Sequence, residues 1–230
     1  MRKNRFVTAI VMLVGAAIVC GLFRFNYNSA YYDGLYDRYI IVNMLALIWV
    51  PMATIILVFR ANPESFGFVM SIRRQVWLIT AALFAGVLLL IMIVARMTAF
   101  QDYYPIFRLF DGFEPAFAGY PSTNPFTQAP WLMLYAQASY GMYLFCWEFF
   151  FWGFLLFGLQ RSLGSFVAVV LQAVAFGLLH WGKPEMLPSF AGGIIMGMLA
   201  LYAKSFLPVF VLHWAASISL DVMVVLMRPQ

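Results

Sequence analysis

Charged residues are scarce in this sequence, and their scarcity excludes an ordinary soluble fold. Only 10% of the 230 residues are Asp, Glu, Lys or Arg, whereas 64% are hydrophobic, compared with about 45–50% in soluble domains. No Pro-, Gly- or Ser-rich linker divides the chain, whose length suits one helical bundle. We therefore expect residues 1–230 to form a single membrane domain.

Cysteine and several catalytic motifs are also scarce or missing. The two cysteines, Cys20 and Cys146, lie in apolar runs, which argues against a disulfide framework or a cysteine-based zinc site. There is no HExxH, no paired Gly-x-Gly-Asp and no Gly-x-Ser-Gly with a downstream histidine, so three other kinds of intramembrane protease are excluded. The net charge is +5, but the Lys and Arg residues form no basic stripe with interleaved aromatic residues. We therefore expect no nucleic-acid partner.

Long apolar runs dominate what remains. Seven of them approach the length of about 20 residues that crosses a hydrocarbon core of ~30 Å, which predicts an all-α, polytopic transmembrane bundle of about seven to eight helices. The fourth run is too long for one perpendicular span, so it tilts, protrudes or breaks near Gly141. The runs lie near residues 6–23, 39–59, 76–97, 131–160, 165–181, 188–205 and 206–227.

The charges between the runs predict an orientation in the lipid bilayer. With a cytoplasmic N-terminus, the inner ends carry eight basic residues and one acid, Glu64, whereas the outer ends carry six basic residues and seven acids. This asymmetry favours the N-terminus inside. Residues 101–130 are then an extracytoplasmic loop, whose aromatic rings we expect to anchor at the membrane interface. The inner basic residues are Arg2, Lys3, Arg5, Arg60, Arg73, Arg74, Arg161 and Lys204.

Three ionisable side chains lie inside the later apolar runs. An ionised Glu148 at membrane depth costs at least ~2.5–3.5 kcal/mol unless it is paired or used. His180 and His213, the two histidines of the chain, lie in separate later runs. One carboxylate and two imidazoles can thus converge from three helices and form a functional site. The alternative is that each histidine only bonds one helix to another.

Helical periodicity indicates which side chains share a face. Glu148 is four residues before Trp152, and Phe176 is one turn before His180. In the last run, the three polar residues His213, Ser217 and Asp221 recur every four positions. Because lipid cannot satisfy such a stripe, it must face protein or water.

A glutamate with two histidines supports two related hydrolytic mechanisms. In the first, no cofactor is needed, because the carboxylate removes a proton from water while an imidazole polarises the attacked carbonyl. In the second, Glu148, His180 and His213 hold a zinc ion with water at its open position. The sequence leaves both mechanisms open.

Three motifs carry a family resemblance. The stretches WEFFFWGFLLFGL, FGLLH and LHWAAS resemble the EExxxR, FxxxH and HxxxN motifs of the CPBP family, which comprises CAAX proteases and bacteriocin-processing (Abi-type) enzymes. The resemblance covers about residues 131–227. It implies an all-helical intramembrane endopeptidase that cleaves a membrane-associated protein or peptide, as a multi-pass protein of a bacterial or archaeal cell membrane.

The resemblance also assigns residues. Glu148 matches the second motif glutamate, and His180 and His213 match the two motif histidines. It implies that Glu148 and His180 activate water while His213 and Ser217 stabilise the oxyanion. Three positions depart from the family pattern: Trp147 replaces the first glutamate, Trp152 the arginine and Ser217 the asparagine. The residues expected to line the cavity are Trp147, Trp152, Phe176 and Asp221.

Two other functions compete with proteolysis. The departures from the motifs favour a catalytically silent relative that acts as a binding, immunity or scaffolding protein. A small transporter could use the same three ionisable groups as a proton relay, but no internal repeat of the kind found in transporters is evident.

Overall fold

The computed structural model describes residues 2–26 and 35–228, which form helices and turns with no strand. Helices dominate because most of the chain is apolar and, inside a bilayer, a helix satisfies its own backbone groups. The α-helices are α1 (Arg2–Phe25), α2 (Tyr36–Met44), α3 (Val50–Ala53), α4 (Arg74–Val94), α5 (Thr98–Tyr103), α6 (Glu114–Phe117), α7 (Pro125–Gln128), α8 (Pro130–Glu148), α9 (Leu156–Leu178), α10 (Met186–Ala203) and α11 (Leu207–Met227). The remaining elements are the π-helical segments η2 (Leu45–Trp49), η3 (Thr54–Val58) and η7 (Phe149–Leu155) and the 3₁₀ turns η4 (Pro63–Phe66), η5 (Ile106–Leu109) and η6 (Asp111–Phe113).

Six helical segments of the described residues are long and apolar enough to cross a membrane, and the chain is an integral membrane protein. One of them, Pro130–Leu178, is 49 residues long and contains both the fourth and the fifth predicted run. It folds back at Gly164, whose φ of 79° and ψ of 165° are non-helical and suit a residue without a Cβ. The helix continues unbroken through Gly141, so the break expected there lies instead at Gly164.

Pro51 explains the irregular second span. Proline has no backbone N–H and its ring crowds the carbonyl four residues earlier. The helix widens into η2 before the short α3 that contains Pro51 and into η3 after it. The widened turns let the span continue across the proline, in line with the usual role of π-helical turns as local bulges.

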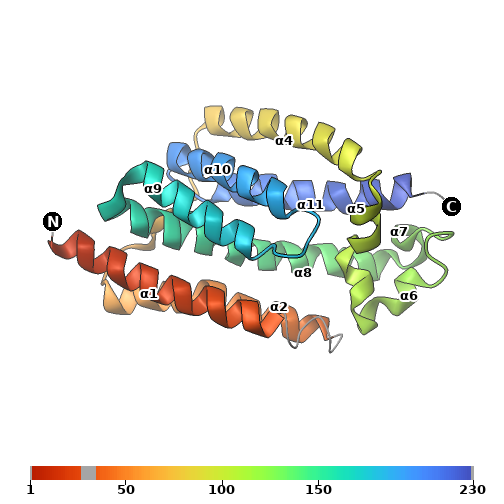
Figure 1. Ribbon diagram of the computed structural model, residues 1–230, viewed down its shortest axis with the longest axis horizontal. Coiled ribbons are helices and arrows are strands. Elements are labelled where there is room, and N and C mark those ends of the chain that lie inside the picture. The colour runs from red at the N-terminus through yellow and green to blue at the C-terminus, as the bar shows by residue number, and fades with distance from the viewer. Residues whose placement is uncertain (1, 27–34, 229–230) are drawn as a thin grey trace.

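The long helices lie side by side and run in alternating directions (Figure 1). Helix α4 lies along one edge of the bundle, next to α10 and α11, and α1 and α2 lie along the opposite edge. Helices α8 and α9 lie between these edges. The end of α8 that carries Glu148 is buried, whereas Trp131, Leu134 and Met142 of the same helix are exposed. The connection between α9 and α10 stops well short of the end of the molecule where α5, α6 and α7 gather.

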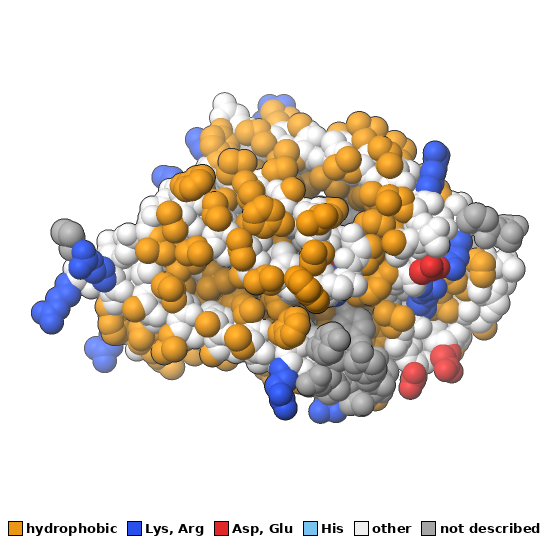
Figure 2. All heavy atoms as spheres, viewed as in Figure 1, with side chains coloured by type: hydrophobic (Ala, Val, Ile, Leu, Met, Phe, Trp, Pro, Cys, Tyr) orange, Lys and Arg blue, Asp and Glu red, His pale blue; other side chains and the backbone are white. Residues whose placement is uncertain are grey.

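The charged side chains gather at the two ends of the bundle. Figure 2 shows Lys and Arg side chains where α1 begins, and the acidic side chains in view at the opposite end. The middle of this face is covered by hydrophobic side chains, as expected for a surface against lipid. Which end is cytoplasmic stays a prediction from the loop charges.

Three aromatic rings of the 98–128 region differ from the expectation that the rings of this loop anchor at the membrane interface. Phe107, Phe110 and Phe113 are 0%, 1% and 2% exposed, and their centroids lie 5.9, 5.2 and 4.9 Å from that of Tyr36. These rings therefore pack into the protein and do not anchor it at the membrane interface. Packing against the buried Tyr36 explains why these rings lie inside the protein, because edge-to-face ring contacts stabilise it beyond the burial of apolar area alone.

Candidate active site

Glu148 and His213 form a buried pair between α8 and α11. The Glu148 Oε1 atom lies 2.6 Å from Nδ1 of His213. The Glu148 side chain is 0% exposed and that of His213 is 22% exposed. A carboxylate can only accept, so Nδ1 of His213 donates and Nε2 is left for another partner. Within the described chain, the second oxygen of Glu148 is buried without a hydrogen-bond partner.

His180 lies two residues beyond the end of α9. Its Nδ1 is 2.8 Å from the Phe176 carbonyl oxygen, which can only accept, so Nδ1 carries the hydrogen. In a neutral ring, Nε2 of His180 then carries a lone pair and acts as an acceptor. The one-turn spacing of Phe176 and His180 predicted from the sequence is thus confirmed as a direct contact.

The ring of Phe176 contacts both histidines. Its centroid is 4.7 Å from that of His180 and 6.0 Å from that of His213. The structure therefore joins Glu148 directly to His213 and brings His180 against the same phenylalanine. The sequence-based mechanism paired Glu148 with His180, whereas the direct contact in the structure is with His213.

Trp147 and Trp152 pack around this phenylalanine. Their ring centroids lie 6.1 and 5.5 Å from that of Phe176, and Trp147 also meets His180 edge-on at 6.2 Å. The regular four-residue spacing used to place Trp152 over Glu148 does not apply, because η7 begins directly after Glu148 and has wider turns. Both tryptophans line the aromatic side of the site.

Asp221 and Ser217 lie on α11 beyond His213. Asp221 is 3% exposed and accepts a hydrogen bond of 2.6 Å from Nε2 of Gln137 on α8. Asp221 therefore ties the two helices together, while Ser217, between it and His213, stays partly exposed. Sequence reasoning missed Gln137, although it lies eleven residues before Glu148, which is three helical turns on the same face.

Glu185 is a second residue that sequence reasoning did not assign to the site. It directly precedes α10 and is partly exposed, and its Oε2 atom is buried without a partner in the described structure. Burial raises the pKa of its carboxyl, and Lys183, a hydrogen bond with Tyr104, its own backbone and His213 each lower it in part. Only a weak signal marks it in the sequence, because Glu185 is one of several acids in connecting segments.

The donor atoms do not fit a metal centre in this arrangement. Within residues 2–26 and 35–228, no three side chains of His, Cys, Asp or Glu are grouped closely enough to hold a metal ion. Each histidine already uses Nδ1 for a protein partner. The zinc hypothesis for Glu148, His180 and His213 therefore gains no support from their placement, and no catalytic step is derived through a metal.

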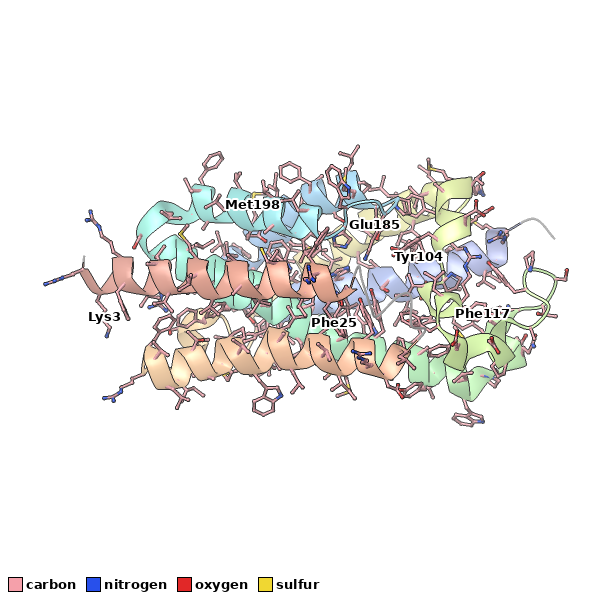
Figure 3. All side chains as sticks on the ribbon, turned by 60° about the horizontal axis from the view of Figure 1, so that its bottom comes forward. Lys3, Phe25, Tyr104, Phe117, Glu185 and Met198 are labelled. Carbon is pink, nitrogen blue, oxygen red and sulfur yellow. The ribbon has the colours of Figure 1, made fainter. Side chains whose placement is uncertain are left out.

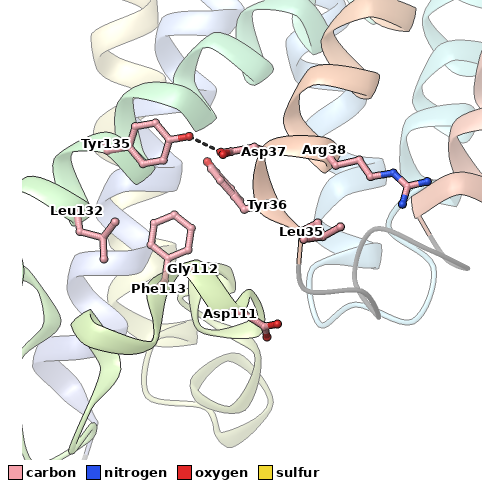
Figure 4. Close-up of a pocket in the computed structure, with 9 residues that line it drawn as sticks. All are labelled: Leu35, Tyr36, Asp37, Arg38, Asp111, Gly112, Phe113, Leu132 and Tyr135. Atoms are coloured by element: carbon pink, nitrogen blue, oxygen red, sulfur yellow. Dashed lines mark hydrogen bonds between the residues drawn. The ribbon is translucent and has the colours of Figure 1, made fainter.

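Neither of two cavities in the described part of the chain contains the ionisable residues of the site. The first, of about 480 Å³, lies between α2, α8 and η6 (Figure 4), where Tyr135 donates a hydrogen bond to Asp37. The second, of about 410 Å³, lies between α1 and the end of α9. The second is apolar and directly flanks His180 in sequence; its lining residues are Val19, Cys20, Phe23, Leu178, Leu179 and Trp181.

Comparison with known proteins supports the motif analysis for one part of the chain. No curated protein and no solved structure matches the sequence. The segment that holds Glu148, His180 and His213 is matched by a protein-family model. Residues 128–219 match the Rce1-like family, described as type II CAAX prenyl endopeptidase Rce1-like, and this match confirms the resemblance predicted from the three motifs.

Proposed function

We propose that the protein is an intramembrane endopeptidase that hydrolyses a peptide bond in a membrane-associated protein or peptide. The observation that carries this proposal is the buried contact of 2.6 Å between Glu148 and His213, inside the segment that matches the endopeptidase family. A buried carboxylate paired with a partly exposed imidazole is a common arrangement for moving protons during hydrolysis.

In this proposal Glu148 acts through His213. Glu148 has no exposed surface, so it cannot touch a substrate directly. It fixes the ring of His213 through Nδ1 and so sets the direction of Nε2. A hydrogen carried by Nε2 of His213 is donated to the oxygen of the attacked carbonyl, where negative charge develops in the transition state.

Two further side chains complete the proposed reaction. Ser217, one turn after His213, supplies a hydroxyl as a second donor to the oxyanion, in the place where the resemblance implies asparagine. His180 accepts a hydrogen bond from the attacking water at Nε2, because its Nδ1 is held by Phe176. Nε2 of His180 takes a proton from the water as the oxygen of water bonds to the carbonyl carbon, and it returns that proton to the amine when the C–N bond breaks.

The proposed substrate carries an apolar chain next to its scissile bond. The name of the matching family refers to CAAX prenyl endopeptidases. The apolar cavity of about 410 Å³ is lined by Leu179 and Trp181, which flank His180 in the sequence. A hydrocarbon chain in this cavity would bury apolar surface and hold the adjacent peptide close to the site.

The direct test is hydrolysis by the purified protein in lipid vesicles. A farnesylated peptide ending in a CAAX sequence is compared with the same peptide lacking the farnesyl group, and products are identified by mass spectrometry. We expect cleavage of the farnesylated peptide, slower cleavage of the plain one, and loss of both with His213→Gln. A protein that binds the farnesylated peptide without cleaving it would be the catalytically silent relative, and the proposal would be wrong.

A further inference from the structure

We propose that the active site opens on the membrane face opposite to the N-terminus, and that its substrates present their scissile bond on the extracytoplasmic side. This inference rests on the proposed endopeptidase function and names the side of the membrane from which a substrate reaches the site. Three observations carry it: the position of His180 in a connecting turn, the short distance from that turn to the site, and the closure of the other end of the bundle by residues 59–73.

The first observation is that His180 lies in the turn between α9 and α10 and not inside a span. This turn, residues 179–185, also contains the charged residues Lys183 and Glu185, both partly exposed. It carries Trp181 as well, whose side chain is 63% exposed. Charged residues beside an exposed tryptophan are typical of the boundary between membrane and water. His180 therefore lies at a depth where water is available.

Helix α10 places this turn on the face opposite to Lys204. Its 18 residues extend about 27 Å at 1.5 Å per residue, close to the ~30 Å of a hydrocarbon core. Lys204 directly follows the helix. In Figure 3, Glu185 lies towards the end of α1 that carries Phe25 and away from Lys3. The turn with His180 and the start of the chain are therefore on opposite faces.

The second observation is that the site lies close to this turn. Phe176, one turn before His180, has its ring centroid 4.7 Å from that of His180 and 6.0 Å from that of His213. His213 in turn contacts Glu148 at 2.6 Å. Since one helical turn rises about 5.4 Å, the two histidines lie within about one turn of the face that carries the 179–185 turn.

The apolar cavity lies at the same side. Its residues on α1 fall within the last seven positions of that helix, far from Arg2 and close to Phe25. A hydrocarbon chain held there would lie in the leaflet next to the 179–185 turn. The residues of α1 that line the cavity are Val19, Cys20 and Phe23.

The third observation is that residues 59–73 close the other end of the bundle. Phe66 in this segment is 0% exposed. The Phe68 ring lies 5.4 Å from that of Phe149, the residue directly after Glu148. The segment therefore packs into the bundle between Glu148 and the opposite face.

Other contacts hold the 59–73 segment in place. The Ser205 hydroxyl donates a hydrogen bond of 2.7 Å to the Val69 carbonyl. At its start, the Phe59 ring lies 6.5 Å from that of Phe6 in the first turns of α1, so the segment lies at the end where the chain begins. A substrate that approached from this end would have to displace the segment.

The charges of the connecting segments give each face its side of the membrane. The end that carries the N-terminus has eight basic residues and one acid, which predicts that it is cytoplasmic. The face with His180 is then extracytoplasmic. The substrate class that fits is an exported protein or peptide whose apolar part lies in the outer leaflet.

Cysteine labelling tests the direction of opening without using activity. Ser217→Cys, with Cys20→Ala and Cys146→Ala, is treated in intact cells with a membrane-impermeant maleimide. We expect it to react from outside, as should Lys183→Cys in the 179–185 turn. Glu64→Cys, the matched control in the exposed part of the 59–73 segment, should react only after the membrane is permeabilised. Failure of Ser217→Cys to react from outside, whether or not it reacts after permeabilisation, would overturn the inference.

Sided cleavage is the second measurement. A farnesylated peptide is tethered to a large soluble protein, so that it cannot cross the bilayer, and is offered to sealed right-side-out and inverted membrane vesicles. We expect cleavage by right-side-out vesicles, its loss in inverted ones, and its loss in both with His213→Gln. Equal or faster cleavage by inverted vesicles would overturn the inference. Lack of cleavage in both orientations would overturn the proposed function, and the labelling result would then decide the direction by itself.

Discussion

Oε1 of Glu148 lies 2.6 Å from Nδ1 of His213, so the last residue of α8 is bonded to the second turn of α11. The pair has two roles in the bundle. It satisfies a carboxylate that would otherwise be costly to bury, and it fixes the tautomer and direction of the imidazole.

We expect the two residues to behave as one unit in catalysis. Glu148→Gln should lower kcat by at least ~10²-fold, and His213→Gln should do the same. Because each variant disables the other residue as well, the double variant should be little worse than either single one. A double-mutant cycle on cleavage of the farnesylated peptide measures this. Fully additive losses would show that Glu148 does not act through His213.

Substitution of Ser217 should lower kcat or leave it equal or higher, depending on whether the new side chain can donate a hydrogen bond. Ser217→Ala removes a proposed oxyanion donor and should lower kcat by up to ~10²-fold with little change in KM. Ser217→Asn supplies an amide donor with a longer reach and should equal or exceed the parental kcat. If Ser217→Ala and Ser217→Asn lower kcat equally, residue 217 does not contact the oxyanion.

Chelation should leave the activity unchanged. The described side chains do not gather three metal ligands, and the proposed mechanism uses only protein groups and water. The measurement is the cleavage rate after dialysis against a strong zinc chelator, with elemental analysis of the protein before and after. Activity that disappears with the metal and returns on adding zinc would revive the two-histidine, one-glutamate zinc site.

Gly141 provides a test of packing between α8 and α11. A Cβ at Gly141 would collide with the Trp214 ring, which donates a hydrogen bond of 3.1 Å to the Gln137 carbonyl. Gly141→Ala should therefore lower the free energy of unfolding by ~1–3 kcal/mol. Gly86→Ala on α4, where a Cβ meets nothing within 4 Å, should raise it slightly. Thermal unfolding of both variants in one detergent gives the comparison, and equal melting temperatures would contradict it.

The helical bundle could be predicted from the sequence because crossing a bilayer requires long apolar runs. Hydropathy located the spans and showed that Glu148 would need a partner. It could not decide between His180 and His213, because that choice depends on the rotation of each helix about its own axis. The π-helical segment η7 changes the angle between successive side chains along the span. The sequence FFFWGFL has no residue preference that indicates a π-helical turn.

Two other features could not be predicted from the sequence, each for a different physical reason. The rings of the 98–128 region could be assigned equally well to the membrane interface or to a protein core, since both bury aromatic area, and only the position of Tyr36 decides. Glu185 was hidden because a single acid before a helix is usually solvated. The burial of its Oε2 atom becomes evident only in the folded structure.

The π-helical segment η7 also determines which mutations the site can tolerate. A π-helical turn holds more residues than an α-helical one, so Phe149–Leu155 contains surplus chain relative to a regular helix. Deleting one residue there would return the segment towards a regular α-helix and would leave the residues before and after it on their present faces. A deletion in the regular helix α8 has no surplus residue to draw on and would rotate the following residues by about 100°. Among homologues, a single-residue deletion should therefore occur more readily within this segment than in the helix before it.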